Sequence, residues 1–550
     1  KLAASVGIPG LQVDVNGKVD WHNYGQAIAD AEARGPGEHG AAVELPKNSV
    51  IESKKRKLYK VNGFNALVSD LIPLNRSLPD IRHPNCAKKR YLANLPTVSI
   101  VIPFHNEHLS TLLRTVTSVI NRSPKHLIKE VILADDYSSK PELGRNLENA
   151  VAKHFKKRVK IIRAKKREGL IRTRLLGARA AIGDVLLFLD SHTEANINWL
   201  PPLLEPIAEN PHTVACPFID VLDYDTLAYR AQDEGARGSF DWELYYKRLP
   251  LLDVDRAEPS KPFKSPVMAG GLFAINREYF WQLGGYDEGL DVWGGEQYEL
   301  SFKIWQCGGQ MLDVPCSRVG HVYRQFAPFP NPGIGDFVGR NYRRVAEVWM
   351  DEYKNYLYNR RPHYRNLDYG DISKQKALRE RLKCKSFQWF MEKVAFDQPL
   401  RYPPIEPPDL AWGKIRNVAA AKCLDSKFLD SGKKIGLDKC IGSKSDGGSR
   451  EQNFVLTWHQ DLRPAKRTVC LDVSSSENKA PVVLWTCHGM QGNQLFKYNL
   501  VTMQLRHPVT AQCLDADPDN DEIFMNPCTK ELKTQKWEFE HVNTTAIMND

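Results

Sequence analysis

The 550-residue sequence has no uninterrupted apolar run of the ~18 residues that a membrane-spanning helix requires, and its N-terminus has no signal-peptide pattern. We therefore expect a soluble chain, cut from the lumenal portion of a longer protein. Hydrophobic residues make up 42% of the sequence, with 12 Trp, 20 Tyr and 21 Phe, which is ample for packed interiors. The length exceeds what one ordinary core supports, so two or three domains are predicted.

The sequence also lacks one concentrated basic region, although its net charge is +10. Lysine and arginine are scattered, except in the short runs 54–57, 87–90, 153–158 and 164–167. Clustered cations are what release counterions from a nucleic acid backbone. Scattered ones are typical of a solvated surface, so no nucleic-acid partner is predicted.

Cysteine is sparse, and none of the 11 cysteines has the CxxC spacing of a zinc site. Six of them fall after residue 420 as regularly spaced pairs: Cys423 and Cys440, Cys470 and Cys487, Cys513 and Cys528. Such pairing predicts disulfides and an oxidising compartment. Three N-glycosylation sequons, at Asn75, Asn121 and Asn543, are compatible with a secretory route.

The pattern changes along the chain. Residues 1–60 are polar and glycine-containing without sustained periodicity, which predicts a stem or a partly ordered arm. From Thr97 onward, apolar strands alternate with helices, as in "TVSIVIPF", "HLSTLLRTVTSVI" and "EVILADD". This alternation predicts an α/β domain over 61–400, with a mainly parallel sheet that is covered on both faces. Ligands of such sheets bind beyond the carboxyl ends of the strands, where Asp136 and Asp190 stand.

The stretch "PPIEPPDLAWG" is proline-rich and has no helical or strand period, so residues 401–412 are predicted to be a linker. Beyond it, "CLD" recurs at Cys423, Cys470 and Cys513, a period of about 45 residues. Three short-strand units of this kind predict a threefold all-β domain over 413–543.

The most informative strand, "VLLFLD", runs directly into Asp190-Ser191-His192. If the chain stays extended, the side chains of Asp190 and His192 lie on the same side and reach one cation. An oxygen plus an imidazole suits Mn²⁺ or a similar borderline metal. The alternative is an aspartate that caps a turn beside an exposed histidine.

Two further segments favour a ligand site. His321 follows a glycine in "SRVGHVYRQF", where it could complete the coordination, and Glu296 follows two glycines in "DVWGGEQYE". A glycine pair lets the backbone approach a ligand closely, or it simply forms a tight turn before a helix. "MAGGLF" repeats the arrangement, and together these features describe a site for a phosphorylated, sugar-sized ligand.

In this order, "FHNE", "DDYS", "REGLIRTR", "DSHTE", "AGGLF", "WGGEQYE" and "GHVYR", followed by three CLD repeats, closely resemble the polypeptide N-acetylgalactosaminyltransferases. The resemblance implies a Rossmann-like GT-A catalytic domain followed by a ricin-type β-trefoil lectin domain. It implies a retaining glycosyltransferase that moves GalNAc from UDP-GalNAc to Ser or Thr, which starts mucin-type O-glycosylation. It also implies a type II Golgi protein, with the membrane signal-anchor outside this chain.

The resemblance assigns residues one motif at a time. It implies that the Mn²⁺ ligands are Asp190, His192 and His321. It places four residues around the donor: His105, Asp136, Arg167 and Gly271. It gives catalytic roles to Glu296, to Trp293 on a mobile loop, and to Arg324 in a flap that closes on UDP.

The sequence departs from the family pattern at a few positions. Thr193 replaces a common Cys, Gln297 a common Asn, and Ala327 and Phe329 replace His and Tyr of several members. The spelling "GGEQYELS" is similar to members that prefer acceptors already bearing GalNAc. The resemblance also implies disulfides Cys86–Cys316 and Cys307–Cys384, which leave Cys216 free and buried.

The second repeat is predicted to bind the sugar. A trefoil pocket needs an aspartate, an aromatic face and an asparagine near the closing turn. All three repeats supply the aspartate, as Asp425, Asp472 and Asp515, but only the second adds the other members: Trp485, His488 and Asn493. The first repeat is expected to have no element at the distance of Asn493. The alternative is that these aspartates only brace the backbone.

Two rival classes remain. One is a carbohydrate-binding lectin with an inactive transferase domain, which would keep the trefoil and lose the metal ligands. The other is a glycoside hydrolase with an appended lectin module, which needs two carboxylates around the bond to be cut. The DxH motif at a nucleotide-type strand end argues against the second class.

Overall fold

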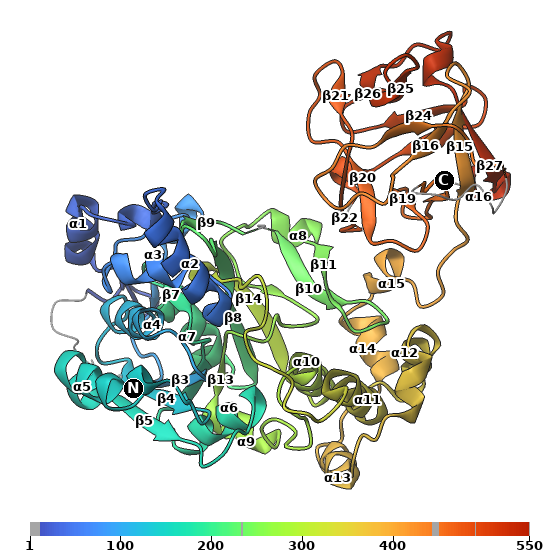
Figure 1. Ribbon diagram of the computed structural model, residues 1–550. Coiled ribbons are helices and arrows are strands. Elements are labelled where there is room, and N and C mark those ends of the chain that lie inside the picture. The colour runs from blue at the N-terminus through green and yellow to red at the C-terminus, as the bar shows by residue number, and fades with distance from the viewer. Residues whose placement is uncertain (1–11, 233–234, 443–449, 490, 549–550) are drawn as a thin grey trace. The chain divides into compact units, whose positions relative to one another are not determined.

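The computed structural model describes residues 12–232, 235–442, 450–489 and 491–548. It divides into two compact units, one ending at Pro404 and the other beginning at Ile405 (Figure 1). The boundary falls inside the proline-rich stretch that was predicted to be a linker. In the described part of the chain, no helix combines the length and the apolar character needed to cross a membrane.

The N-terminal segment is folded onto the first unit. Its elements are β1 (Lys18–Val19), α1 (Tyr24–Glu32), η1 (Glu38–Gly40), α2 (Ser49–Asn62), α3 (Ala66–Leu71), η2 (Pro84–Lys88) and β2 (Tyr91–Leu92). β1 pairs with β2, and Val19 and Trp21 are buried in the core. The predicted arm over the first 60 residues therefore differs from the structure: the described residues from 18 onward form ordered elements, because buried apolar side chains and helix caps such as Asn48 compensate for the weak periodicity.

The first unit is built on one twisted sheet. Its strands are β3 (Val98–Phe104), β4 (Ile128–Asp135), β5 (Val159–Arg163), β6 (Val185–Phe188), β7 (Thr193–Ala195), β8 (Thr213–Leu222), β9 (Tyr229–Arg230), β12 (Phe263–Lys264), β13 (Phe273–Asn276) and β14 (Gln310–Val322). The main path runs β12-β14-β8-β13-β6-β3-β4-β5. β5, β4, β3 and β6 are mutually parallel, as are β8 and β14, whereas β13 is antiparallel to both of its neighbours. The predicted α/β domain is confirmed, but its sheet is mixed, because β7, β9, β12 and β13 pair antiparallel with their neighbours.

Helices cover both faces of this sheet. They include α4 (Leu109–Asn121), α5 (Arg145–His154), α6 (Leu170–Arg179), α7 (Leu200–Glu209), α9 (Arg277–Gln282), α10 (Glu296–Gln306) and α11 (Phe337–Trp349). Along β3, Ile100 and Ile102 belong to one core, with α4 and α7, while Val101 belongs to the other, with α6 and α10. Burial on both faces is why the strand is apolar throughout.

The remaining elements of the first unit are η3 (Pro141–Leu143), η4 (Lys156–Arg158), β10 (Ala236–Phe240), β11 (Tyr246–Pro250), α8 (Asp253–Arg256), η5 (Asp351–Tyr353), α12 (Lys354–Arg360), η6 (Pro362–Asn366), α13 (Ser373–Arg381), α14 (Phe387–Lys393) and α15 (Gln398–Arg401). Two disulfides link distant segments, Cys86–Cys316 and Cys307–Cys384. Cys216 is free and buried on β8, and burial raises the pKa of its thiol. All three features match the predictions.

The second unit is an all-β trefoil. It contains β15 (Ala411–Asn417), β16 (Cys423–Asp425), β17 (Gly436–Asp438), β18 (Phe454–Leu456), β19 (Leu462–Pro464), β20 (Val469–Asp472), β21 (Ala480–Pro481), β22 (Val483–Thr486), η8 (Gly492–Gln494), β23 (Lys497–Asn499), β24 (Gln504–His507), β25 (Gln512–Asp517), β26 (Glu522–Pro527), η9 (Lys533–Gln535), β27 (Trp537–Val542) and α16 (Thr544–Met548). The leucines of the three CLD motifs share one core: Leu424, Leu471 and Leu514. Each repeat closes with its predicted disulfide: Cys423–Cys440, Cys470–Cys487 and Cys513–Cys528. The shared core explains why the repeats fold together.

Candidate active site

Asp190, His192 and His321 converge at one edge of the sheet. Their potential ligand atoms all lie within 4.8 Å of one another, and the rings of His192 and His321 are 4.7 Å apart. The expected extended chain, which would have placed Asp190 and His192 on the same side, is wrong, because the chain turns after Asp190. The turn leads into β7, whose pairing with β14 sets Thr193 opposite His321 and so brings the third side chain to the other two.

The surroundings of Asp190 keep its carboxylate charged. Burial alone would raise the pKa of Asp190, but the hydrogen bond with His321 and the charge of Arg174 outweigh burial and hold the pKa below its usual range. Arg174 Nη2 donates to Asp190 Oδ1 at 3.2 Å. Gly271 borders the same carboxylate so closely that a Cβ there would lie 2.6 Å from Asp190 Oδ2. A side chain at position 271 would therefore displace the Asp190 carboxylate.

Glu107 is a member of the site that sequence reasoning missed. It is buried, and its Oε2 accepts from Ser191 Oγ at 2.8 Å, His192 Nδ1 at 2.9 Å and Arg324 Nη2 at 2.6 Å. Because a carboxylate only accepts, Nδ1 of His192 carries the proton and Nε2 is left for a cation. The signal was present, since Glu107 is the last residue of "FHNE".

Glu296 begins α10, and its carboxylate lies inside the protein. Its Oε2 accepts from the backbone N–H of Gly294 at 2.7 Å, and its Oε1 is 3.8 Å from Arg174 Nη1. Desolvation raises the pKa of Glu296, and the nearby Arg174 does not cancel this effect. Gly294 and Gly295 have φ values of +94° and +88°, so the glycine pair does form a tight turn before a helix, and that turn also holds the carboxylate. Arg174 bridges Asp190 and Glu296 and was also missed, although it lies in "REGLIRTR".

Three of the four predicted donor-binding residues, His105, Asp136 and Arg167, meet at the ends of β3 and β4. The Asp136 carboxylate accepts from the backbone N–H groups of Glu168 at 2.6 Å and Gly169 at 2.9 Å, and it also pairs with Arg167. His105 Nδ1 lies 2.7 Å from the carbonyl oxygen of Asp136. Burial lowers the pKa of His105 to about 4, so its imidazole is neutral at pH 7 and Nδ1 donates to that carbonyl.

Two irregular segments border these groups. Trp293 is 54% exposed, and its loop is attached to the donor side because Leu170 N–H donates to the Val292 carbonyl at 2.8 Å. Residues 323–336, between β14 and α11, contain no helix or strand. Within this segment, Phe329 lies 5.3 Å from the Arg324 guanidinium and 5.4 Å from the ring of His105. Both segments thus lie beside predicted donor contacts.

In the second trefoil repeat, an exposed aromatic ring stands on a rigid frame. Trp485 is 53% exposed on β22, opposite Cys470 of β20. Asp472 Oδ2 accepts from Gln494 Nε2 at 3.1 Å, and Gln494 Oε1 accepts the backbone N–H of His488 at 3.1 Å. Asn493 precedes Gln494 and is exposed. The four predicted residues therefore belong to one local structure.

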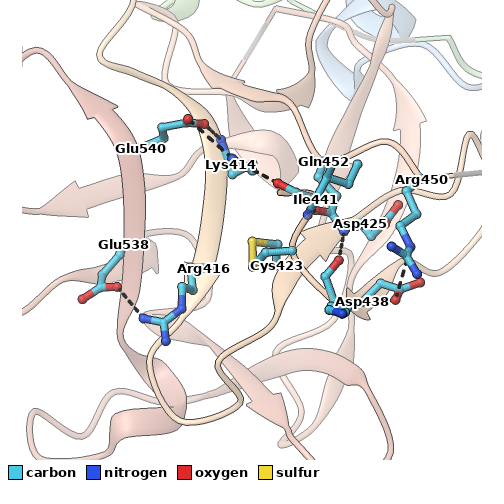
Figure 2. The surroundings of a disulfide bond; sticks show 12 residues. Lys414, Arg416, Cys423, Asp425, Asp438, Ile441, Arg450, Gln452, Glu538 and Glu540 are labelled. Carbon is cyan, nitrogen blue, oxygen red and sulfur yellow. Dashed lines mark hydrogen bonds and ion pairs between the residues drawn. A yellow bond between two sulfur atoms is a disulfide. The ribbon is translucent and has the colours of Figure 1, made fainter. Parts of the chain in front are cut away.

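The other repeats reuse this frame with a different rim. Figure 2 shows the first repeat, where Asp425 lies beside Gln452 near the Cys423 disulfide and Asp438 faces Arg450 at 3.6 Å. Gln452 accepts from Ile441 N–H at 2.9 Å just as Gln494 accepts from His488 N–H. The first repeat has no closing element at the spacing of the second repeat, as expected, but Gln452 takes the same role further along the chain. The long stretch before it, which includes residues outside the described ranges, hid the correspondence.

The three CLD aspartates differ in how fully protein donors occupy them. Asp425 accepts from Lys427 N–H, Glu451 N–H and Gln452 Nε2. Asp515 likewise accepts from three donors: Ala516 N–H, Asn526 Nδ2 and Gln535 Nε2. Among the described residues, Asp472 accepts from the side-chain amide of Gln494 only. The bracing role therefore exists in all three repeats, and Asp472 keeps the most capacity for a ligand.

Known protein families match three parts of the chain. Residues 99–284 match Glycosyl transferase family 2, and residues 252–326 match the N-terminal domain of galactosyltransferase. Residues 411–537 match the ricin-type beta-trefoil lectin domain. The first two matches cover the sheet and its site, and the third covers the trefoil.

Relatives match both units together. Polypeptide N-acetylgalactosaminyltransferase 10 of Homo sapiens is 52% identical over 96% of this chain and 87% of its own length. N-acetylgalactosaminyltransferase 6 of Drosophila melanogaster is 53% identical over 98% of this chain and 81% of its own length. The crystal structure of GalNAc-T7 with UDP, GalNAc and Mn²⁺ superimposes with a TM-score of 0.66 at 39% identity, covering 92% of this chain and 93% of that one. From its motifs, its two units and these relatives, the chain belongs to the polypeptide N-acetylgalactosaminyltransferase family.

Proposed function

We propose that this chain transfers GalNAc from UDP-GalNAc to Ser and Thr hydroxyls of polypeptides, with retention of configuration and with Mn²⁺ as cofactor. The observation that carries the proposal is the convergence of Asp190, His192 and His321 within 4.8 Å, in a chain of this family. The reaction is placed in the Golgi lumen, which suits five disulfides and a family of Golgi enzymes.

The residues present fit the metal. They offer one carboxylate oxygen and two imidazole nitrogens, a mixed set that suits Mn²⁺. Nδ1 of His321 is buried and has no hydrogen-bond partner in the described structure, and Glu107 fixes the tautomer of His192. When bound, Mn²⁺ would offset the negative charge that builds up on the departing diphosphate.

The donor end of the site is organised around Asp136. By accepting two backbone N–H groups, its carboxylate fixes residues 167–169, and neutral His105 lies against its carbonyl. We assign the uridine to Asp136 and His105, and the diphosphate to Arg167 and Arg324. These two arginines provide positive charge where the leaving group becomes more negative.

Glu296 and Trp293 are assigned to the sugar. Retention without an evident covalent nucleophile suits a front-face route, in which the leaving phosphate takes the proton of the acceptor hydroxyl. Glu296, held by Gly294 N–H beside Arg174, would orient the sugar, with Gly271 leaving room beside Asp190. Residues 323–336, called the flap below, and Trp293 would exclude water that competes with the acceptor.

The trefoil is assigned the recognition of GalNAc already present on an acceptor. Asp472 would accept from sugar hydroxyls, Trp485 would stack on the apolar face of the ring, and His488 and Asn493 would fix its orientation. Ser/Thr-rich peptides and glycopeptides are then both acceptors, with a preference for the glycosylated ones.

One assay tests the assignment. The protein is incubated with UDP-GalNAc and Mn²⁺ together with paired naked and GalNAc-bearing peptides, and products are identified by mass spectrometry. Addition of GalNAc to peptide, lost on chelation, is expected. Binding of glycopeptide without transfer would instead indicate a lectin with an inactive transferase domain, and release of GalNAc from glycopeptide would indicate a hydrolase.

A further inference from the structure

The C-terminal end of α2 touches the base of the flap. The carbonyl of Gly63 accepts the backbone N–H of Gln325 at 3.0 Å. Gly63 approaches so closely that a Cβ there would lie 2.6 Å from the carbonyl oxygen of Phe326 and 3.2 Å from Cβ of Arg324. A side chain at position 63 would therefore push the flap away from the helix.

Aromatic contacts reinforce this backbone contact. The rings of Tyr59 and Phe326 meet edge to face with centroids 5.8 Å apart. The guanidinium of Arg324 lies 5.8 Å from the ring of Phe64, which is fully buried. The first residues of the flap are thus held by a helix end on one side, while Arg324 reaches Glu107 on the other.

The same helix end also borders the donor loops. Asn62 Oδ1 accepts from Lys140 Nζ at 2.8 Å. The backbone N–H of Lys140 donates to Asn106 Oδ1 at 3.1 Å, and Asn106 Nδ2 lies 3.3 Å from Nε2 of His105. The end of α2 therefore contacts the flap directly. Through Lys140 and Asn106 it also reaches His105, to which the uridine is assigned.

The helix end is itself fixed firmly. Asn65 N–H donates to the Tyr224 carbonyl at 2.7 Å, and its side-chain amide donates to the Asp225 carbonyl at 2.8 Å. Gly63 has φ +75° and caps α2 through its N–H, which donates to the Tyr59 carbonyl at 2.8 Å. The cap alone explains why a glycine stands there, but it does not explain the approach to Phe326.

We infer that the end of α2, through Tyr59 and Gly63, is a positioning element that sets the base of the flap for transfer. The inference rests on the proposed function, in which the flap excludes water from the donor. A displaced flap would slow transfer and would also admit water, so the donor would be hydrolysed more often per transfer event. A merely structural role would change the stability of the protein without changing the ratio of donor hydrolysis to transfer.

The test compares Gly63→Ala with Gly17→Ala. Gly17 has nearly the same backbone conformation, φ +74°, but a Cβ there would meet nothing within 4 Å. The two variants thus share the strain of a left-handed alanine and differ in the contact with the flap. For Gly63→Ala we expect transfer to peptide to fall by about 10²-fold, as for a small misplacement of a catalytic element, and the ratio of UDP-GalNAc hydrolysis to transfer to rise. Gly17→Ala should match the unmodified protein in both.

Equal transfer rates and equal hydrolysis ratios in the two variants would overturn the inference. If Gly63→Ala does not fold, the pair Tyr59→Leu and Phe326→Leu takes its place. If Tyr59 and Phe326 act through their mutual contact, either single change already removes it, and the double variant should lose no more transfer activity than the more impaired single variant. Additive losses of transfer activity would reject the role of α2. Absence of transfer by the unmodified protein would reject the proposed function instead, so the two failures are distinguishable.

Discussion

Asp190 and Asp472 both stand at the end of a buried strand, yet the two units use them differently. Asp190 receives a guanidinium from α6 and an imidazole from β14, and Gly271 leaves room beside its second oxygen. Asp472 is braced by Gln494, an arrangement that Asp425 and Asp515 repeat with Gln452 and Gln535. The catalytic unit therefore concentrates charge at one irregular edge, whereas the trefoil varies only the rim of a repeated frame.

This difference sets the size of the expected effects. A change at the charged edge removes or misplaces the proposed Mn²⁺, and transfer of GalNAc from the donor is lost with it. A change at the trefoil rim removes one aromatic face or one hydrogen bond, and leaves the catalytic unit intact. The predictions below follow this order.

The largest effect is expected for Asp190→Ala and His192→Ala. Each removes a proposed metal ligand from the rim of the sheet and not from its core, so transfer should fall by about 10³-fold or more while the thermal unfolding midpoint changes little. Initial transfer rates at saturating Mn²⁺ test the loss of activity, and circular dichroism melts test the unfolding midpoint. Near-normal turnover in either variant would remove these residues from the metal site.

A smaller effect is expected for Glu107→Gln. Glutamine keeps the volume but loses the charge that binds His192 and Arg324, so Mn²⁺ affinity should fall about 10- to 100-fold. The matched control is Glu130→Gln, another buried carboxylate of the sheet, which accepts from Ser99 Oγ at 2.7 Å and Ile182 N–H at 2.9 Å. Calorimetric titration with Mn²⁺ would contradict this role if both variants bound the ion equally well.

In the trefoil, Trp485→Ala should weaken glycopeptide binding by about tenfold and spare transfer to naked peptide, because the exposed ring contributes to the sugar face and little to the core. Asp438→Ala changes the corresponding position of the first repeat and should have no effect. Asp472→His should abolish glycopeptide binding. Equal losses from Asp438→Ala and Trp485→Ala, measured by titration with a GalNAc-bearing peptide, would show that recognition is not confined to the second repeat.

The smallest effect concerns pH. The pKa of His105 is about 4 in the folded chain, below its ordinary value of 6.5, so the unfolded chain binds more protons between these values. The stability associated with neutral His105 is present above pH 6.5 and is lost as pH falls through 4. Because the ring is partly exposed, we expect a loss of about 1 kcal/mol, and His105→Gln should lack this component. Unfolding free energies of both proteins at pH 7 and pH 4 check it, and parallel losses would contradict it.

Local pattern was enough to predict the covered sheet and a threefold all-β unit, whereas the β-trefoil and most site assignments came from the family resemblance. β3 and β4 are apolar on both faces, and this pattern alone indicates a covered parallel sheet. The antiparallel β13 was not predicted, because four residues after a glycine pair have no distinctive period. The N-terminal helices were missed for a related reason: α2 is rich in lysine, and its place depends on contacts with residues far along the chain.

At the site, the metal candidates were found because aspartate and histidine at a strand end are unusual there. Glu107 and Arg174 were not, since a glutamate and an arginine in helical or loop sequence are most often solvent-exposed. Their role appears only when Glu107 is placed beside His192 and Arg324, which come from segments more than 80 residues away. The closing glutamine of the first trefoil repeat was missed because repeat lengths differ.

The central claim is that one metal centre in the catalytic unit, built from Asp190, His192 and His321, serves a sugar-nucleotide transferase. The most direct test is electron paramagnetic resonance titration of Mn²⁺ in the presence of UDP, for the unmodified protein, Asp190→Ala and Trp485→Ala. We predict one bound Mn²⁺ per chain for the unmodified protein and for Trp485→Ala, and none at the same concentrations for Asp190→Ala. Stoichiometric Mn²⁺ binding by Asp190→Ala would contradict the account.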